Sequence, residues 1–344
     1  MKEESRHWIQ GLLRCLMVVL MVVLLLWPAA ARAYAATVVP VGRAVGIKLL
    51  SDGVVVVGTS AVQTAEGTVD PAKDCGLRAG DIITHINATE VDTIEEVAEV
   101  LQALEGEQMS IRAIRDDRTL QLTAQAVFCP EDNTYKLGAW IRDSMAGIGT
   151  VTFYCPDTGV FGALGHGIND LDTALLMPLE SGSILPASVS GVRKGECGTP
   201  GQLRGVFEQG STLGELWANT EEGIFGTMGS ADWFDGETVE TAERNEVKAG
   251  NATILSNISG KAVEEYDIRI LKVYPSRDSG GGRDFLIQVT DQRLLDTTGG
   301  IVQGMSGSPI MQNGKLVGAV THVMVDDPAT GYGIWIGNML EAAE

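Results

Sequence analysis

The stretch Gly304-Met305-Ser306-Gly307-Ser308-Pro309-Ile310 is the most informative pattern in this chain of 344 residues. A serine between glycines predicts a tight turn, and Pro309 leads from that turn into an apolar strand. If the backbone N–H groups of Gly304 and Ser306 converge in this turn, they form an oxyanion hole for acyl transfer. A glycine- and serine-rich hairpin without any chemistry would show the same pattern, so the assignment depends on partners elsewhere in the sequence.

The same stretch resembles the Gly-x-Ser-Gly-x-Pro signature of chymotrypsin-like serine proteases. It differs from the Gly-x-Ser-x-Gly turn of α/β-hydrolases, because Ser308 replaces the second glycine. Residues 135–344 consist of short apolar runs separated by glycine-containing turns, which is typical of an all-β sandwich or barrel. A short helix is expected only near residues 335–343. Together with the resemblance, this pattern predicts a mainly β protein whose residues 135–344 form a chymotrypsin-like double β-barrel.

A serine nucleophile needs a general base, and three histidines lie beyond residue 35. His166 follows an apolar strand directly and is flanked by Gly165 and Gly167, which places an imidazole at an exposed strand end. His322 follows another apolar run and is equally compatible with a structural strand residue or a wall of the substrate cleft. His85 lies within a predicted strand. We therefore expect His166 to be the base.

The third group of a serine protease site is a carboxylate that fixes the tautomer of the imidazole. Asp291 ends the apolar run 285–290 and lies fifteen residues before Ser306. Asp170 and Asp172 are closer to His166 in sequence, in a loop whose path the sequence does not predict. Each of these carboxylates is also compatible with an ordinary turn.

Residues 75–87 (Cys-Gly-Leu-Arg-Ala-Gly-Asp-Ile-Ile-Thr-His-Ile-Asn) resemble the Gly-Leu-x-x-Gly-Asp-x-Ile-x-x-Ile-Asn run of PDZ domains. Apolar residues at helical spacing predict a helix over 93–104, and alternation over 109–127 predicts a hairpin. The resemblance implies a small α+β PDZ-like domain over 36–128 that binds a peptide or a protein's C-terminus as an added strand. The residues expected to border that groove are Gly46, Ile47, Lys48 and Leu49. The alternative is a groove filled by a neighbouring segment of the same polypeptide.

Residues 1–35 have the layout of a secretory signal: basic residues, an uninterrupted apolar run over 15–27, and alanine-rich cleavage candidates. A helix that extends back to Trp8 would be long enough to remain as a membrane anchor. In both cases the rest of the protein is expected outside the cytoplasm.

The composition excludes some functions. A net charge of −20 argues against a basic surface for nucleic acid over the whole molecule. The five cysteines show neither a Cys-x-x-Cys pair nor the spacing of zinc ligands, so no metal is expected, and the chemistry requires no organic cofactor.

Four stretches taken together resemble the stage IV sporulation protein B family, the PDZ-containing serine peptidases of endospore-forming bacteria. The stretches are residues 165–168, 289–295, 303–310 and 321–334. This resemblance implies that His166 is the general base, Ser306 the nucleophile and Asp291 the orienting acid. Met305 stands where trypsin-like enzymes have an aspartate that pairs with a newly freed N-terminus, so activation by that ion pair is not expected.

The resemblance also implies a biological task. The peptidase would be exported from the forespore into the space between its two membranes, where it would cleave a membrane-associated regulatory protein. That cleavage would free an intramembrane metalloprotease, which then processes the precursor of sigma factor K. Two alternatives are a non-catalytic PDZ adaptor or scaffold and a general envelope quality-control protease, although the latter usually has its PDZ domain after the protease.

Overall fold

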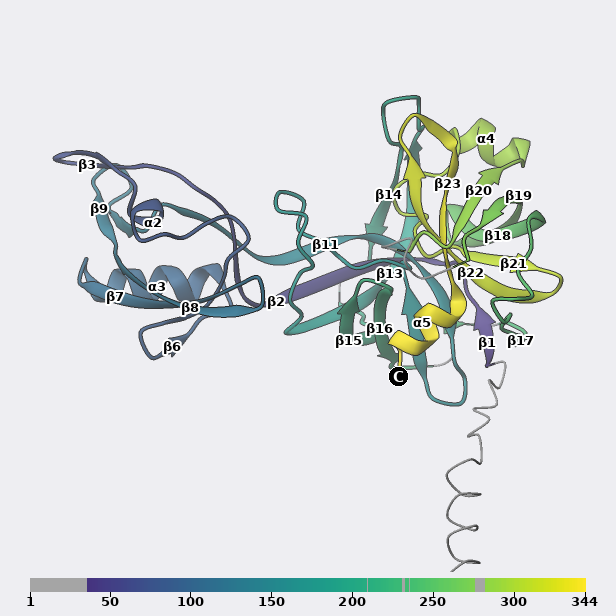
Figure 1. The fold of residues 1–344 in the computed structure, drawn as a ribbon, viewed down its shortest axis with the longest axis horizontal. Coiled ribbons are helices and arrows are strands. Elements are labelled where there is room, and N and C mark those ends of the chain that lie inside the picture. The colour runs from purple at the N-terminus through teal and green to yellow at the C-terminus, as the bar shows by residue number, and fades with distance from the viewer. Residues whose placement is uncertain (1–35, 209, 231–232, 235, 276–281) are drawn as a thin grey trace, which may run out of the picture. The chain divides into compact units, whose positions relative to one another are not determined.

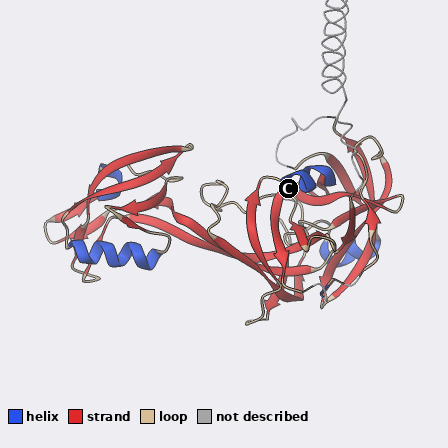
Figure 2. Ribbon diagram, turned by 90° about the horizontal axis from the view of Figure 1, so that it is seen from below, coloured by secondary structure: helices blue, strands red, loops and turns tan. Residues whose placement is uncertain are grey.

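The computed structural model describes residues 36–208, 210–230, 233–234, 236–275 and 282–344. The expected signal or anchor segment, residues 1–35, lies outside the described residues. Residues Thr37–Glu344 form one compact unit, and it is mainly β, as expected (Figure 2). In this part of the protein, no helix is both long enough and apolar enough to cross a membrane.

Six antiparallel strands close a first barrel (Figure 1). In ring order they are β2 (Ala44–Thr59), β11 (Ala139–Tyr154), β12 (Val160–Ala163), β16 (Gly223–Met228), β15 (Gly214–Thr220) and β13 (Ser181–Arg193). The ring closes because β2 pairs with both β11 and β13. Three further strands are β1 (Thr37–Pro40) beside β11, β17 (Val239–Glu240) beside β1, and β14 (Gln202–Phe207) beside β13. The core includes the buried side chains of Val151, Phe161 and Ile184.

A second closed barrel follows in the sequence. Its strands in ring order are β18 (Gly250–Ser259), β19 (Ala262–Val273), β20 (Phe285–Val289), β23 (Asp327–Trp335), β22 (Lys315–Met324) and β21 (Pro309–Gln312). Phe285, Ile310 and Val320 are among its fully buried side chains. Helix α4 (Gln292–Thr298) connects β20 to the nucleophile turn, and helix α5 (Ile336–Ala342) follows β23, where a short helix was expected. The two rings confirm the predicted double barrel, but not its range of 135–344, because the first ring includes β2 from the residues assigned to the PDZ-like domain.

The PDZ-like part shares strand β2 with the first barrel. Val54 and Val55 of β2 pair with β5 (Ile82–Ile86), which pairs with β7 (Gln108–Arg115), and β7 forms the expected hairpin with β8 (Arg118–Gln125). Helix α3 (Ile94–Leu104) packs into the same core as these strands. The remaining elements are β3 (Val62–Thr64), β4 (Gly67–Val69), α2 (Pro71–Asp74), β6 (Thr89–Glu90), β9 (Val127–Cys129) and β10 (Thr134–Lys136).

The segment expected to border a peptide groove has no free edge. In β2, Gly46 lies opposite Ile148 of β11 on one side and opposite Leu185 of β13 on the other. Gly46, Ile47, Lys48 and Leu49 are paired in the same way along both edges. The prediction that these residues bind a peptide is wrong, because strand addition requires an edge whose N–H and C=O groups are unpaired.

The start of β11 occupies the strand position beside helix α3. Residues 139–142 of β11 pair with the second half of β2, and Ile141 packs against the core that contains Val97 and Leu101 of α3. The N–H of Ile94, the first residue of α3, donates to the carboxylate of Asp143 at 3.0 Å. This is the alternative raised by the sequence, in which a neighbouring segment of the same polypeptide fills the groove.

Candidate active site

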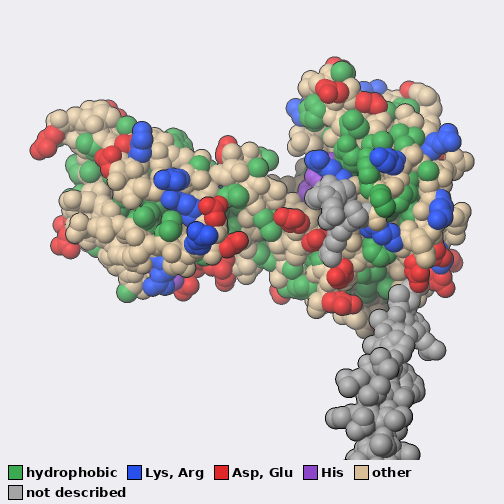
Figure 3. All heavy atoms as spheres, in the orientation of Figure 1, with side chains coloured by type: hydrophobic (Ala, Val, Ile, Leu, Met, Phe, Trp, Pro, Cys, Tyr) green, Lys and Arg blue, Asp and Glu red, His purple; other side chains and the backbone are tan. Residues whose placement is uncertain are grey.

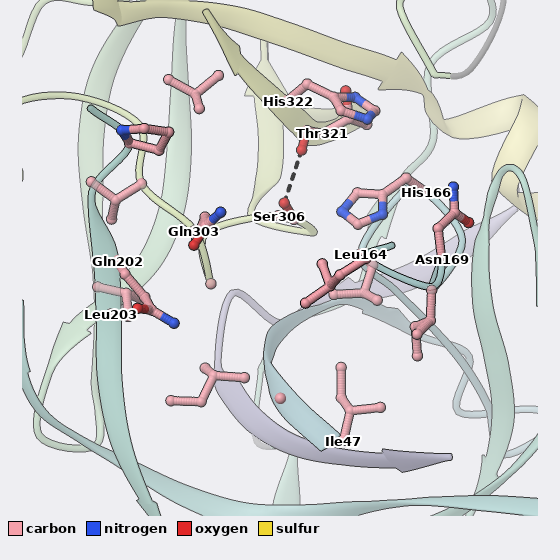
Figure 4. Close-up of a pocket in the computed structure, with 18 of the residues that line it drawn as sticks. Ile47, Leu164, His166, Asn169, Gln202, Leu203, Gln303, Ser306, Thr321 and His322 are labelled. Carbon is pink, nitrogen blue, oxygen red and sulfur yellow. Dashed lines mark hydrogen bonds between the residues drawn. The ribbon is translucent and has the colours of Figure 1, made fainter. Parts of the chain in front are cut away.

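Ser306 and His166 line one cleft, with a volume of about 780 Å³ (Figure 4). Residues of both barrels form its walls: Leu164 comes from the first barrel, and Val302 and Val323 come from the second. On the face that Figure 3 shows, Lys, Arg, Asp and Glu side chains are interspersed, without a continuous basic patch among the described residues. The structure thus brings the expected nucleophile and the expected base together from positions 140 residues apart.

Ser306 lies on the turn between α4 and β21. The N–H groups of the neighbouring Met305 and Gly307 donate to the carbonyls of Val302 (3.1 Å) and Val320 (2.8 Å). Among the described residues, no acceptor takes the N–H of Gly304 or of Ser306. These are the two donors that the sequence predicts for the oxyanion hole.

Gly307 is required by the shape of this turn. Its φ of +96° lies in the left-handed region, which L side chains rarely adopt. A Cβ atom at this position would also clash with the backbone oxygen of Thr150. The glycine after the serine therefore serves close backbone packing between the turn and strand β11.

Thr150 of β11 joins the nucleophile turn to the loop that carries the base. Its N–H donates to the carbonyl of Ser306 at 3.0 Å, and its hydroxyl donates to the carbonyl of Gly304 at 2.8 Å. Its own carbonyl accepts the N–H of Leu164 at 3.2 Å, just before the base. The hydroxyl of Thr152, two residues along β11, donates to the same turn. The buried end of one strand therefore positions both halves of the site, a role for which the sequence offers no signal.

The ring of His166 is held by its own loop. Its Nδ1 donates to the carbonyl of Gly167 at 2.8 Å, because a carbonyl can only accept. This contact keeps the proton on Nδ1 and leaves the lone pair of Nε2 free, as a general base requires. Figure 4 shows the ring turned toward Ser306. Burial of the ring lowers the pKa of His166.

The Ser306 hydroxyl does not bond to His166 in this structure. Its Oγ donates to the carbonyl of Thr321, the first residue of the Thr-His pair in β22, at 2.8 Å (Figure 4). The nucleophile therefore lies between its base and a backbone acceptor and is hydrogen-bonded to the acceptor.

Asn219 is a supporting residue that the sequence analysis missed. Its Oδ1 accepts the N–H of Ile168 at 2.8 Å, and its Nδ2 donates to the carbonyls of Ile168 and Met177. These bonds anchor the loop that follows His166.

Asp291 is not joined to His166. Its carboxylate caps helix α4 by accepting the N–H of Arg293 at 2.8 Å, accepts the N–H of Asp267 at 3.3 Å, and pairs with the Arg293 guanidinium at 2.8 Å. Hydrogen bonds from Arg293 are the main cause that lowers the pKa of Asp291 to about 2. The expected contact with the base is absent because the strand that Asp291 ends leads into a helix that takes up its carboxylate.

The two other candidate carboxylates also have partners elsewhere. Asp170 is buried, pairs with Arg142 and accepts the N–H groups of Asp172 and Thr173. Asp172 pairs with the same guanidinium at 2.8 Å. Across the described part of the protein, no carboxylate is hydrogen-bonded to His166.

The ring nearest to the base is that of His322, on β22. The centroids of the two imidazoles are 5.2 Å apart and their planes are tilted by 39°. Burial, together with the charges of His166 and Arg283, lowers the pKa of His322 to about 4. Of the two interpretations that the sequence left open, the structure supports the cleft wall, since His322 lines the cleft with Ser306.

The profile of the SpoIVB peptidase S55 family matches residues 133–340, well over half of the chain. This chain belongs to that family. A PDZ domain profile matches residues 69–115 of the S55 peptidase. The protein is therefore a serine peptidase with a PDZ domain, as the sequence predicted.

Solved structures that resemble the S55 peptidase include a protease and a PDZ domain. The active form of the Rv3671c protease from M. tuberculosis is 14% identical, over 72% of this chain and 83% of that chain, with a TM-score of 0.33. The PDZ domain of the SdrC-like protein from Listeria monocytogenes is 24% identical, over 26% of this chain and 87% of that one, with a TM-score of 0.22. No curated protein matches the S55 peptidase.

Among the described residues of the S55 peptidase, no cluster of three or more His, Cys, Asp or Glu side chains could hold a metal ion. The four cysteines in this region are free thiols: Cys75, Cys129, Cys155 and Cys197.

Proposed function

We propose that the S55 peptidase cleaves peptide bonds through an acyl-enzyme formed on Ser306. His166 takes the proton of the Ser306 hydroxyl on Nε2 and returns it to the leaving amine. The N–H groups of Gly304 and Ser306 stabilise the oxyanion of the tetrahedral intermediate. The observation that supports these roles most directly is that the Ser306 side chain and the free ring nitrogen of His166 face each other in one cleft.

The reaction begins with a rotation of the Ser306 side chain. The hydroxyl leaves the carbonyl of Thr321 and turns toward His166, which breaks one neutral hydrogen bond of about 0.5–1.5 kcal/mol. The carbonyl of Thr321 then becomes available to a main-chain N–H of the substrate. Substrate binding along β22 would therefore favour the productive orientation of the nucleophile.

The proposed mechanism assigns different tasks to Gly167 and Asp291. The Gly167 carbonyl holds Nδ1 of His166 and so fixes the tautomer, which is the task expected of Asp291. Asp291 stabilises the start of α4, the helix that precedes the nucleophile turn.

We further propose that this peptidase acts in sporulation signalling. Exported by its N-terminal segment and anchored or released there, it would cleave a membrane-associated regulator in the space between forespore and mother cell, and this would lead to activation of sigma factor K. The support is the family, the order of PDZ domain before peptidase, and the signal-like pattern of residues 1–35. A deletion strain that fails to form spores, yet grows normally under heat stress, would distinguish this role from general quality control.

Labelling of the full-length protein by a fluorophosphonate tests the chemistry. We expect the wild type to be labelled, and Ser306→Ala to abolish both labelling and turnover, the latter by about 10³- to 10⁶-fold. Ser308→Ala is the matched control, because this serine is two residues away but fully buried, with its hydroxyl bonded to Ser256 at 3.1 Å. Labelling that persists in Ser306→Ala would contradict the mechanism.

A further inference from the structure

The base of this site has to carry a positive charge in a buried place. When His166 takes the proton of Ser306, it becomes an imidazolium, and burial disfavours that form. In serine proteases with a triad, a carboxylate offsets this cost. Among the described residues, no carboxylate bonds to His166, and the Gly167 carbonyl is the acceptor that it has.

His322 lies beside the base in the same cleft. Its ring is beside that of His166, with centroids 5.2 Å apart, and both rings line the cleft that contains Ser306. The Nδ1 atom of His322 is buried and has no hydrogen-bond partner among the described residues. A buried polar atom that stays unpaired in a native structure calls for an explanation, and a role during the reaction is one.

We propose that His322 is a positioning residue for His166, a neutral imidazole that takes the place of the carboxylate and stabilises the imidazolium during acylation and deacylation. This inference rests on the proposed roles of Ser306 and His166. The proton passes from Ser306 to His166 and on to the leaving amine, and His322 neither gains nor loses a proton at any step. Its contribution is a ring nitrogen lone pair beside the developing positive charge.

Burial and the charges around the pair keep His322 neutral. The ionisable residues that line the cleft are His166, His322 and Arg204. Burial is the main cause that lowers the pKa of His322 to about 4, and the charges of His166 and Arg283 act in the same direction. His322 therefore stays neutral at pH 5–8, the form in which a ring nitrogen can accept rather than repel.

The test compares two substitutions in the full-length protein, with labelling by the fluorophosphonate followed over pH. His322→Phe keeps an aromatic ring at this position but has no ring nitrogen, whereas His322→Asn places an amide near the position of Nδ1. We expect His322→Phe to lower the labelling rate at neutral pH by about 10- to 100-fold, within the range for general acid–base groups. We also expect the acid limb of the rate–pH profile of His322→Phe to move to lower pH, because the imidazolium of His166 loses a stabilising neighbour. His322→Asn should stay within about tenfold of the wild type.

His85→Phe is the matched control. His85 also has a buried Nδ1 without a partner among the described residues, but it lies in β5 of the PDZ-like part, so its replacement should leave the labelling rate unchanged. Circular dichroism establishes that each variant is folded. If His322→Phe does not fold, the comparison of His322→Asn with His322→Gln replaces it, and the asparagine should be the faster of the two.

Two results would overturn the inference. One is a His322→Phe variant with the wild-type rate and acid limb. The other is an equal loss in the phenylalanine and asparagine variants with an unmoved acid limb, which would show that only the shape of the ring matters. In both cases the His322 variants would still be labelled on Ser306. Failure of the proposed mechanism gives a different result, because labelling would then persist in Ser306→Ala.

Discussion

Replacing Thr150 by valine should separate the positioning of the nucleophile from its chemistry. Valine has nearly the shape of threonine and is equally suited to a strand, so β11 should remain intact. The substitution removes the hydroxyl that donates to the carbonyl of Gly304 at 2.8 Å. Thr150 is fully buried, so water cannot replace the lost donor.

The size of the effect follows from this single bond. A buried carbonyl that loses its partner costs about 1–3 kcal/mol of the free energy of unfolding. A protein with an ordinary free energy of unfolding of about 5–15 kcal/mol stays folded after such a loss. The turn that carries Ser306 would still shift, and a displacement of about 1 Å in a catalytic group can cost about 10²-fold in rate. We therefore expect Thr150→Val to lower the rate of fluorophosphonate labelling by about 10- to 100-fold.

Labelling rates and urea unfolding curves of the full-length protein measure the two effects separately. Thr64→Val is the matched control, since the Thr64 hydroxyl donates to the carbonyl of Gly67 at the same distance of 2.8 Å, in the β3–β4 hairpin. It should leave the labelling rate unchanged. A wild-type rate in Thr150→Val, or an equal loss in Thr64→Val, would refute the role of β11 in positioning the site.

Three further outcomes follow from the site. Because burial lowers the pKa of His166, the base stays neutral below its ordinary value of 6.5, and the acid limb of activity should lie below that pH in a rate–pH profile. The pKa of Asp291 falls from 3.8 to about 2 on folding, so its ion pair with Arg293 stabilises the fold above about pH 4, and this contribution is lost as the pH approaches 2. The difference in stability between wild type and Asp291→Asn should therefore shrink from pH 5 to pH 2 in urea titrations. Gly307→Ala should lower labelling at least tenfold, because its Cβ would clash with the Thr150 backbone; an unchanged rate would contradict the observed turn.

The sequence predicted the parts of this protein whose signals are local. Short apolar runs between glycine turns indicated an all-β sandwich or barrel, and helical spacing predicted α3, which the structure confirms with a Thr93–Glu96 capping box at its start. The turn around Ser306 and the strand end at His166 were recognised from their flanking glycines, since backbone conformation at a turn depends on the residues of the turn itself, although His166 is less exposed than expected. Helix α4 was not predicted from the sequence.

The tertiary structure decided which segments meet. The strand pattern of Gly46–Leu49 is the same whether its edges are free or paired, and only the positions of β11 and β13 close both edges. The family resemblance assigned Asp291 to His166, but a nearby guanidinium and a helix start take its carboxylate. The proximity of His322 to His166 likewise arises from segments of different barrels. Hydrogen bonds and ring contacts are made across distances of a few ångströms between residues far apart in the sequence, so local composition could predict the elements of this site but not their partners.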